Sequence, residues 1–296
     1  MSDQGQTPIF TANSRRTLRV VLTFGALLAL LLLAIGGLYT TAGQLLDQAA
    51  LDIAMQRASS FDWVNGVLTN SISLYTVAIA AGVIMLIAAV RGRFALALRA
   101  GVMILGANLM TQVLKTYLLH RPYLGIGFDL PNSFPSGHTT LLVSLALALA
   151  VVLPREIRSI TGFVLSFVVA GLVISIVILG WHRPLDVIGG ILVAFMWAMA
   201  LAPQEEPSPP SDRLNTGAII GSLAVLVLLI TAFVIKRDQL AATLTHVSQG
   251  VPVDALAAGS RALAHIYTVG TCAILAALVV LAINLVVYLQ TGRKRA

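Results

Sequence analysis

Residues 137–201 read GHTTLLVSLALALAVVLPREIRSITGFVLSFVVAGLVISIVILGWHRPLDVIGGILVAFMWAMAL. Three apolar runs, at about Thr139–Leu153, Ile157–Gly180 and Leu185–Leu201, are separated here by two short polar connections. A bilayer core of about 30 Å needs roughly 20 apolar residues in helical form. The second run meets this length, and the first and third are shorter. The stretch therefore predicts consecutive membrane helices joined by short turns.

Five further apolar runs lie on either side of this stretch, at about Leu18–Tyr39, Ser71–Val90, Phe94–Leu119, Gly217–Ile235 and Leu263–Leu289. The whole chain has 296 residues, of which 58% are hydrophobic and 10% charged. About a quarter of the residues of a soluble domain are charged. We therefore expect an all-α fold, a polytopic membrane helical bundle of about eight transmembrane helices.

A Pro/Ser-rich segment, PQEEPSPPSDR at 203–213, interrupts the series of spans. This composition is typical of a flexible linker. We expect three parts: a six-span core at 1–202, a cytoplasmic linker at 203–213 and a two-span C-terminal hairpin at 214–296. The first span is too long for the hydrophobic region of a signal peptide, so it predicts an uncleaved anchor.

Two longer connections have mixed polarity. Residues 43–65 predict an amphipathic helix, either lying at the membrane interface or packed as a cap on the ends of the spans. Residues 236–262 predict a second loop on the same side, with a short helix from Val253 to Ala262. Within the last span, Asn284 predicts an interhelical hydrogen bond.

The distribution of positive charge predicts the orientation. If the spans alternate from a cytoplasmic N-terminus, 12 of the 19 Lys and Arg residues are cytoplasmic, namely Arg15, Arg16, Arg19, Arg91, Arg93, Arg99, Arg155, Arg158, Arg213, Arg293, Lys294 and Arg295. Cytoplasmic loops carry an excess of basic residues. We therefore expect both termini in the cytoplasm and a multi-pass protein of the plasma (inner) membrane.

The net charge of +7 does not indicate a nucleic-acid partner. The basic residues form no stripe and have no interleaved aromatic residues, which such partners require. The single cysteine, Cys272, excludes an intrachain disulfide and lies within an apolar run. We expect membrane lipids, and no nucleic acid, as partners.

Chemistry-bearing residues gather at three places: KTYLLHRP at 115–122, PSGH at 135–138 and WHRPLD at 181–186. In the orientation above, all three fall at the outer ends of spans three to six. Ionisable residues beside membrane spans are candidates for function. Each residue also has an alternative role. Lys115 could be a lysine that reaches the membrane interface. His138 could cap a helix, and His182 and Asp186 could be a surface pair.

Together these residue types suit phosphoryl transfer. Lys115 and Arg121 supply positive charge for phosphate oxygens. Ser136 and Gly137 precede a helix, whose N-terminal amides bind anions. His182 and Asp186 are four residues apart, so on a helix the carboxylate can hold the imidazole in one tautomer. A second histidine, His138, can then protonate a leaving alkoxide.

At these residues the chain resembles the type-2 phosphatidic acid phosphatase (PAP2) family, over roughly residues 71–202. The pattern of this family is Lys-x6-Arg-Pro, then Pro-Ser-Gly-His, then Ser-Arg-x5-His-x3-Asp. The resemblance implies a six-helix core and a metal-independent phosphatase without a cofactor. It implies that His182 is the nucleophile, that Asp186 orients it and that His138 is the general acid. It also implies phosphate-binding roles for Lys115, Arg121, Ser136 and Gly137.

The sequence departs from this pattern twice. Five residues, not six, separate Lys115 from Arg121, and one residue turns a helical side chain by about 100°. Ile176 stands where the family has arginine, after Ser175. We hypothesise that Arg183 replaces this phosphate-binding arginine from another direction. His120 is either a further phosphate ligand or an interfacial residue.

The leading functional hypothesis is a membrane phosphatase that hydrolyses a lipid-linked phosphate or diphosphate monoester. It would form a phosphohistidine intermediate at the periplasmic or extracellular face of the plasma (inner) membrane. Candidate substrates are lipid phosphates and polyprenyl (di)phosphates. One alternative is a phosphotransferase that uses the same site with an alcohol acceptor. The other is a degenerate, non-catalytic lipid-binding or transport protein.

Overall fold

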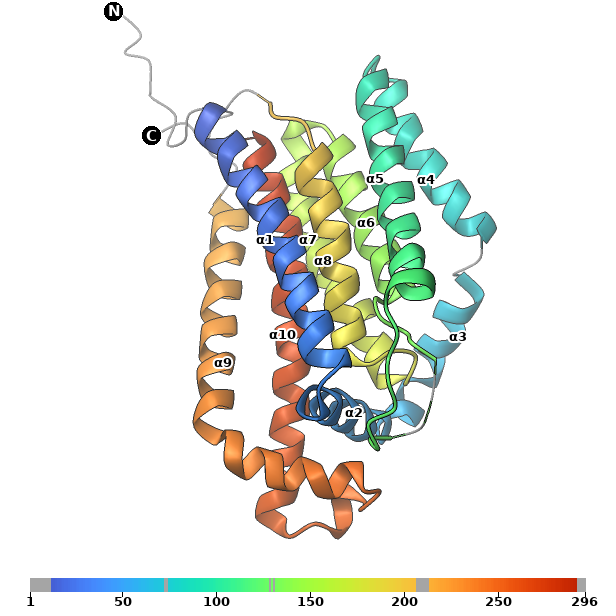
Figure 1. Ribbon diagram of the computed structural model, residues 1–296. Helices are drawn as coiled ribbons and strands as arrows, with labels where there is room; N and C mark the ends of the chain where they lie inside the picture. Colours follow the sequence, from blue (N-terminus) through green and yellow to red (C-terminus); the bar gives the residue numbers. More distant parts are fainter. Residues whose placement is uncertain (1–11, 72–73, 128, 130, 206–212, 292–296) are drawn as a thin grey trace, which may run out of the picture.

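The computed structural model describes residues 12–291 except 72–73, 128, 130 and 206–212 (Figure 1). The described residues form helices and connecting loops without a strand. The α-helices are α1 (Ala12–Leu38), α2 (Thr41–Met55), α3 (Asp62–Ser71), α4 (Leu74–Ala89), α5 (Phe94–Val113), α6 (Gly137–Val152), α7 (Arg155–Ile178), α8 (Pro184–Leu201), α9 (Arg213–Ser248) and α10 (Ala258–Thr291). Short 3-10 helices cover Ala58–Phe61 and Val253–Ala255, and a π-helical turn, η2, covers Leu114–Leu118.

The predicted helical membrane fold is confirmed. Among the described residues, six helices are long and apolar enough to cross a membrane: α1, α5 with its π turn, α7, α8, α9 and α10. Two shorter apolar helices, Tyr75–Ala89 and Gly137–Val152, occupy the other two predicted positions. The protein is therefore a multi-pass membrane protein.

Helix α6 is the centre of the bundle. It contacts α5, α8, α7, α4 and α10, and Val143, Leu147 and Val151 are completely buried. Its 16 residues span about 24 Å at 1.5 Å per residue. Because lipid does not surround this helix, it does not need the length of a lipid-facing span.

The C-terminal hairpin packs on this bundle. Helix α10 contacts α7, α8 and α6, and its Ile283 is fully buried in the same hydrophobic core as α6. Within that contact, Asn284 donates to Ser166 Oγ (3.1 Å) and accepts from Asn215 Nδ2 (2.6 Å). The predicted interhelical role of Asn284 is confirmed.

Helix α9 is longer than the predicted span, which ended at Ile235. No glycine or proline follows until Gly250, which has a φ of +84°, so the helix continues to Ser248. Its last turns bury Leu240, Leu244 and Val247 against Ala49 and Ile53 of α2. The expected helix from Val253 to Ala262 is instead a 3-10 turn followed by the start of α10.

Helix α2 lies across one end of the bundle, as Figure 1 shows. Gln44, Asp47 and Gln48 are buried together with the apolar residues of this helix. Of the two interpretations of residues 43–65, the structure therefore supports the packed cap. We call this end of the bundle the site end.

The opposite end, which we call the terminal end, contains the start of α1 and the end of α10. Glu205 forms ion pairs there with Arg93 (2.7 Å), Arg155 (3.0 Å) and Arg158 (2.8 Å). Arg158 lowers the pKa of Glu205 most, and the value falls to about 2. Most of the predicted linker, 206–212, lies outside the described residues.

Two adjacent glycines bring α8 against the loop before α6. A Cβ atom on Gly189 would lie 2.6 Å from Phe134 Cε2, and one on Gly190 would lie 2.8 Å from the carbonyl oxygen of Ser136. The second contact is with backbone, which cannot rotate away as a side chain can. The short distance between α8 and this loop therefore depends on Gly190.

We predict that Gly190→Ala lowers the free energy of unfolding by about 1–3 kcal/mol, because the added methyl group overpacks this contact. Thermal unfolding in detergent measures the effect. The control is Gly171→Ala in α7, where a Cβ meets no atom within 4 Å. Equal melting temperatures for the two variants would contradict the prediction.

Candidate active site

The second and third sequence motifs meet at the site end. His138 is in the first turn of α6, and His182 lies just before α8. The Nδ1 atom of His138 is 3.2 Å from Nε2 of His182, and the ring centroids are 5.4 Å apart. The two imidazoles are therefore in direct hydrogen-bonding contact.

Asp186 lies behind His182. Its Oδ2 atom is 3.5 Å from His182 Nδ1, which is longer than a normal hydrogen bond. The same oxygen accepts from the hydroxyl of Ser133 (2.5 Å) and from the amide of Arg183 (3.2 Å). Catalytic hydrogen bonds are often long in unliganded sites and shorten when substrate binds. The order His138, His182, Asp186 is compatible with the acid, nucleophile and orienting carboxylate that the family resemblance implies.

Backbone contacts fix these residues. Ser136 caps α6, since its Oγ accepts from the amide of Thr139 (3.2 Å). The amide of Ser136 in turn donates to the carbonyl oxygen of Asp186 (2.8 Å). Asp186 itself accepts from the amide at the start of α8, as N-terminal carboxylates do. The two helix N-termini are thus joined, so their amide ends face one region, which favours an anion.

Lys115 lies in the π-helical turn, where the amide of Leu119 donates to the carbonyl oxygen of Leu114 (2.9 Å). A Cβ atom on Gly137 would lie 3.9 Å from Lys115 Nζ, so the ammonium group reaches the start of α6. A π turn changes the angular position of the residues that follow it, and such turns are frequent at functional sites. This turn gives a physical reason why the shorter spacing in the first motif still brings Lys115 to the site.

Arg121 is nearly buried, with a side chain 6% exposed. Its Nη1 atom donates to Asp47 Oδ2 (3.1 Å), and its Nη2 atom is buried without a hydrogen-bond partner among the described residues. Arg183 donates from Nε to Gln48 Oε1 (2.9 Å) and from Nη1 to Ser133 Oγ (3.5 Å). Burial, and secondly the charge of Arg121, lower the pKa of Arg183. The charges of Asp186, Asp47 and Asp52 oppose this shift.

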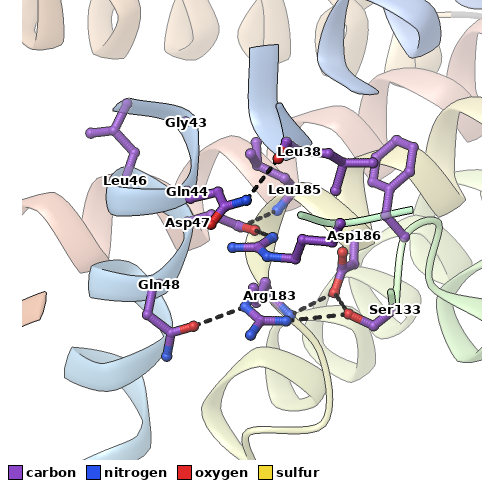
Figure 2. Close-up of polar contacts among 12 residues, drawn as sticks. Leu38, Gly43, Gln44, Leu46, Asp47, Gln48, Ser133, Arg183, Leu185 and Asp186 are labelled. Carbon is purple, nitrogen blue, oxygen red and sulfur yellow. Dashed lines mark hydrogen bonds and ion pairs between the residues drawn. The ribbon is translucent and has the colours of Figure 1, made fainter. Parts of the chain in front are cut away.

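Asp47 is the residue that the sequence analysis missed. It accepts from the amide of Leu185 (2.8 Å) through Oδ1 and from Arg121 through Oδ2, as Figure 2 shows for the Leu185 contact. Burial, and secondly the charge of Asp186, raise the pKa of Asp47 to about 7, although Leu185 and Arg121 oppose this shift. Asp47 therefore connects the arginine of the first motif to the turn that contains His182.

The sequence carried a signal for this residue. Gln44, Asp47 and Gln48 are at positions i, i+3 and i+4, and so form one polar face on an otherwise apolar helix. Gln44 donates to the carbonyl oxygens of Leu38 and Pro122, both at 2.7 Å. A polar face on a capping helix predicts hydrogen bonds with the ends of the spans that it covers.

Several other residues lie beside the site. Trp181, expected at the membrane interface, packs on His138 with ring centroids 5.0 Å apart. His120 contacts Tyr39 at 5.2 Å. An open cavity of about 520 Å³ is lined by Lys115, Thr116, Leu119, His120, Arg121, Asp129, Pro131 and Asn132. Ile176 is completely buried and belongs to the hydrophobic core.

Residues 96–208 match the family model described as the PAP2 superfamily. No curated protein and no solved structure matches the chain. All three motifs fall within the PAP2 segment, whereas Asp47 and Gln48 of α2 lie outside it. This match supports phosphatase activity on phosphate esters.

We predict that Asp47→Asn lowers kcat/KM for phosphate release by about 10- to 100-fold, which corresponds to about 1.4–2.8 kcal/mol. The amide keeps the size of the side chain but removes the charge that holds Arg121. Phosphate release from a lipid phosphate in detergent measures the effect, and the melting temperature shows whether folding also changes. The control is Asp62→Asn, which is exposed at the start of α3. Equal kinetics for the two variants would contradict a positioning role.

Proposed function

We propose that the protein is a membrane phosphatase that hydrolyses a lipid-linked phosphate or diphosphate monoester through a phosphohistidine at His182. The observation that carries this proposal is the 3.2 Å contact between His182 and His138, within a PAP2 segment, beside three cationic side chains. A nucleophile and a proton donor in contact, next to an anion site, meet the geometric requirement for phosphoryl transfer.

The reaction has two steps. In the first, Nε2 of His182 attacks phosphorus, the P–O bond to the lipid breaks, and His138 gives a proton to the leaving oxygen. In the second, His138 accepts a proton from water, the water oxygen attacks phosphorus, and the N–P bond breaks. Asp186 accepts a hydrogen bond from the Nδ1–H group of His182 and stabilises the positive charge that forms on the ring. Because the imidazoles touch, His138 must move aside when phosphate binds.

The charges around this pair support the binding of a phosphate. Arg121, Arg183 and Lys115 supply three positive charges, and Nη2 of Arg121 is buried without a hydrogen-bond partner among the described residues. A dianionic phosphate would complement these charges, and the fork of an arginine fits two phosphate oxygens. Gly137 places a backbone amide at the N-terminus of α6, where an anion is favoured, and the hydroxyl group of Ser136 can donate its proton to a phosphate oxygen. We propose phosphate-binding roles for all five residues.

The membrane position supports a lipid substrate. The site lies at one end of the spans, where it can reach a headgroup while the hydrocarbon chains stay in the bilayer. The basic residues at the terminal end favour a cytoplasmic location for that end. We propose that the site faces the periplasm or exterior from the plasma (inner) membrane.

We predict that His182→Ala lowers phosphate release by at least about 1,000-fold, because removal of a nucleophile eliminates the covalent route. The measurement uses purified protein in detergent with EDTA and a panel of phosphatidate, phosphatidylglycerophosphate, polyprenyl phosphate and polyprenyl diphosphate. Acid-labile 32P bound to the wild-type protein, and absent from the variant, reports phosphohistidine.

The control is His246→Ala, since His246 is exposed on α9 outside the site. Equal phosphate release by wild type and His182→Ala would contradict the proposal. A parallel assay with an added alcohol acceptor measures transfer. Phosphorylated alcohol in place of free phosphate would show a phosphotransferase instead of a hydrolase.

We predict that Arg183→Ala lowers kcat/KM by about 100-fold and that Arg183→Lys retains part of the activity, because lysine keeps the charge but not the fork. Both variants are assayed for phosphate release and for thermal unfolding, since Arg183 also binds Gln48. Near-normal turnover of a folded Arg183→Ala variant would show that this residue does not replace the missing arginine at position 176.

A further inference from the structure

A second cavity, of about 540 Å³, lies between the six-span part of the chain and the C-terminal hairpin. Five helices line it: α1, α2, the start of α8, α9 and α10. Its volume is within the range of small-molecule sites, roughly 300–1,000 Å³. The PAP2 segment supplies only the residues of α8, so most of the wall comes from parts of the chain outside it.

The lining is almost entirely apolar, and the cavity is open toward the lipid-facing surface of the bundle. Leu32 of α1, Ile230 of α9 and Ile266 of α10 all line the cavity, and they are 60%, 55% and 67% exposed. In a membrane protein these side chains face lipid. Gly36 of α1 also lines the cavity, and a Cβ atom there would meet no atom within 4 Å. The cavity therefore has free space that is continuous with the bilayer.

The physical chemistry of such a space selects its occupant. Apolar cavities remain dry, since water finds no hydrogen-bond partners in them. An empty space also loses the dispersion contacts of its lining atoms. In a bilayer, the molecules available to restore these contacts are lipid hydrocarbon chains. The cavity extends along α9 from Leu229 to Leu240, which is about 16 Å at 1.5 Å per residue.

Charge is confined to one part of the lining. Lys236 and Asp47 are the two charged lining residues, and both lie toward the site end. Asp47 already binds Leu185 and Arg121. For Lys236, no ion pair occurs among the residues that the structure describes. A lysine beside an apolar channel complements the phosphate of a lipid headgroup.

The cavity lies directly behind the catalytic turn. Leu185, which precedes Asp186, lines it, and its amide binds Asp47. Its Cδ1 atom would lie 2.6 Å from a Cβ atom on Gly37, so α1 and the start of α8 are in close contact at this wall. A molecule in the cavity would thus contact Leu185, the residue directly before Asp186.

We propose that this cavity binds the hydrocarbon chain of a phosphate-bearing membrane lipid, with the headgroup at Lys236. The occupant is either the chain of the substrate or a resident phospholipid, which share this chemistry. The binding site itself does not depend on the proposed phosphatase function. Only the interpretation of the occupant as substrate rests on it.

The probe is phosphatidylglycerol with a diazirine in the middle of one acyl chain. It is added in equimolar amount to the delipidated full-length protein in detergent, and labelled peptides are identified by mass spectrometry after irradiation. We expect labelling of residues 32–37, 229–236 and 266–274 to exceed that of α4 by at least about fivefold. Uniform labelling of all lipid-facing helices would overturn the proposal.

Matched variants test the cavity directly. Gly36→Leu and Ala232→Trp fill it and should reduce labelling of α9 and α10 by at least about fivefold. Gly25→Leu, also on α1 and also with no atom within 4 Å of its Cβ, should leave labelling unchanged. Lys236→Gln should reduce labelling, and the neighbouring Arg237→Gln should not. Equal labelling of the filled and control variants would overturn the proposal.

Kinetics then distinguish the two sources. If the substrate chain occupies the cavity, Gly36→Leu raises KM for a long-chain lipid phosphate and not for a short-chain soluble ester. If a resident phospholipid occupies it, both substrates respond equally. Both patterns require the loss of labelling and so support a lipid site. Because labelling needs no turnover, an inactive protein that is labelled in the cavity would refute the phosphatase proposal alone.

Discussion

Two stretches of chain that are 50 residues apart meet where the amide of Ser136 donates to the carbonyl oxygen of Asp186. This hydrogen bond holds the N-terminus of α6 against that of α8, and Gly190 allows the approach because it has no side chain in the contact. The relative position of His138 and His182 follows from it, since each residue is next to one of the two helix starts. The imidazole contact is a consequence of main-chain packing.

Helix α2 completes this arrangement from outside the PAP2 segment. Asp47 binds the arginine of the first motif and the amide of Leu185, while Gln48 holds Arg183. Buried polar groups are costly unless they are hydrogen-bonded, so such a network specifies one position for each member. The cap therefore determines where the two guanidinium groups lie relative to the histidines.

Much of the fold could be predicted from the sequence, because the length of an apolar run directly predicts a membrane helix. In the part of the chain that the structure describes, each of the eight predicted runs contains a helix. The sequence analysis did not predict the extension of α9 beyond Ile235, because Lys236, Arg237 and Gln239 favour helix but end an apolar pattern. The packing of α10 beside α6 and α7 depends on contacts between distant residues, which local periodicity does not contain.

The same limit applies to the site. His138, His182 and Asp186 could be selected from the sequence because each lies in a short motif. The contact of Asp47 with Leu185 joins residues 138 apart in sequence, and no local pattern encodes it. The π turn at Lys115 is similar, since its backbone hydrogen bond is not evident from the residue types alone.

The cluster around Glu205 has a consequence for how the protein sits among lipids. One carboxylate faces three guanidinium groups, those of Arg93, Arg155 and Arg158, which leaves an excess of two positive charges. Anionic phospholipids attract such charge by about 1 kcal/mol for each basic residue near the surface. Insertion would therefore be most favourable with this cluster in the leaflet richer in acidic headgroups. The lipid asymmetry of the bilayer would then help to maintain one orientation of the protein.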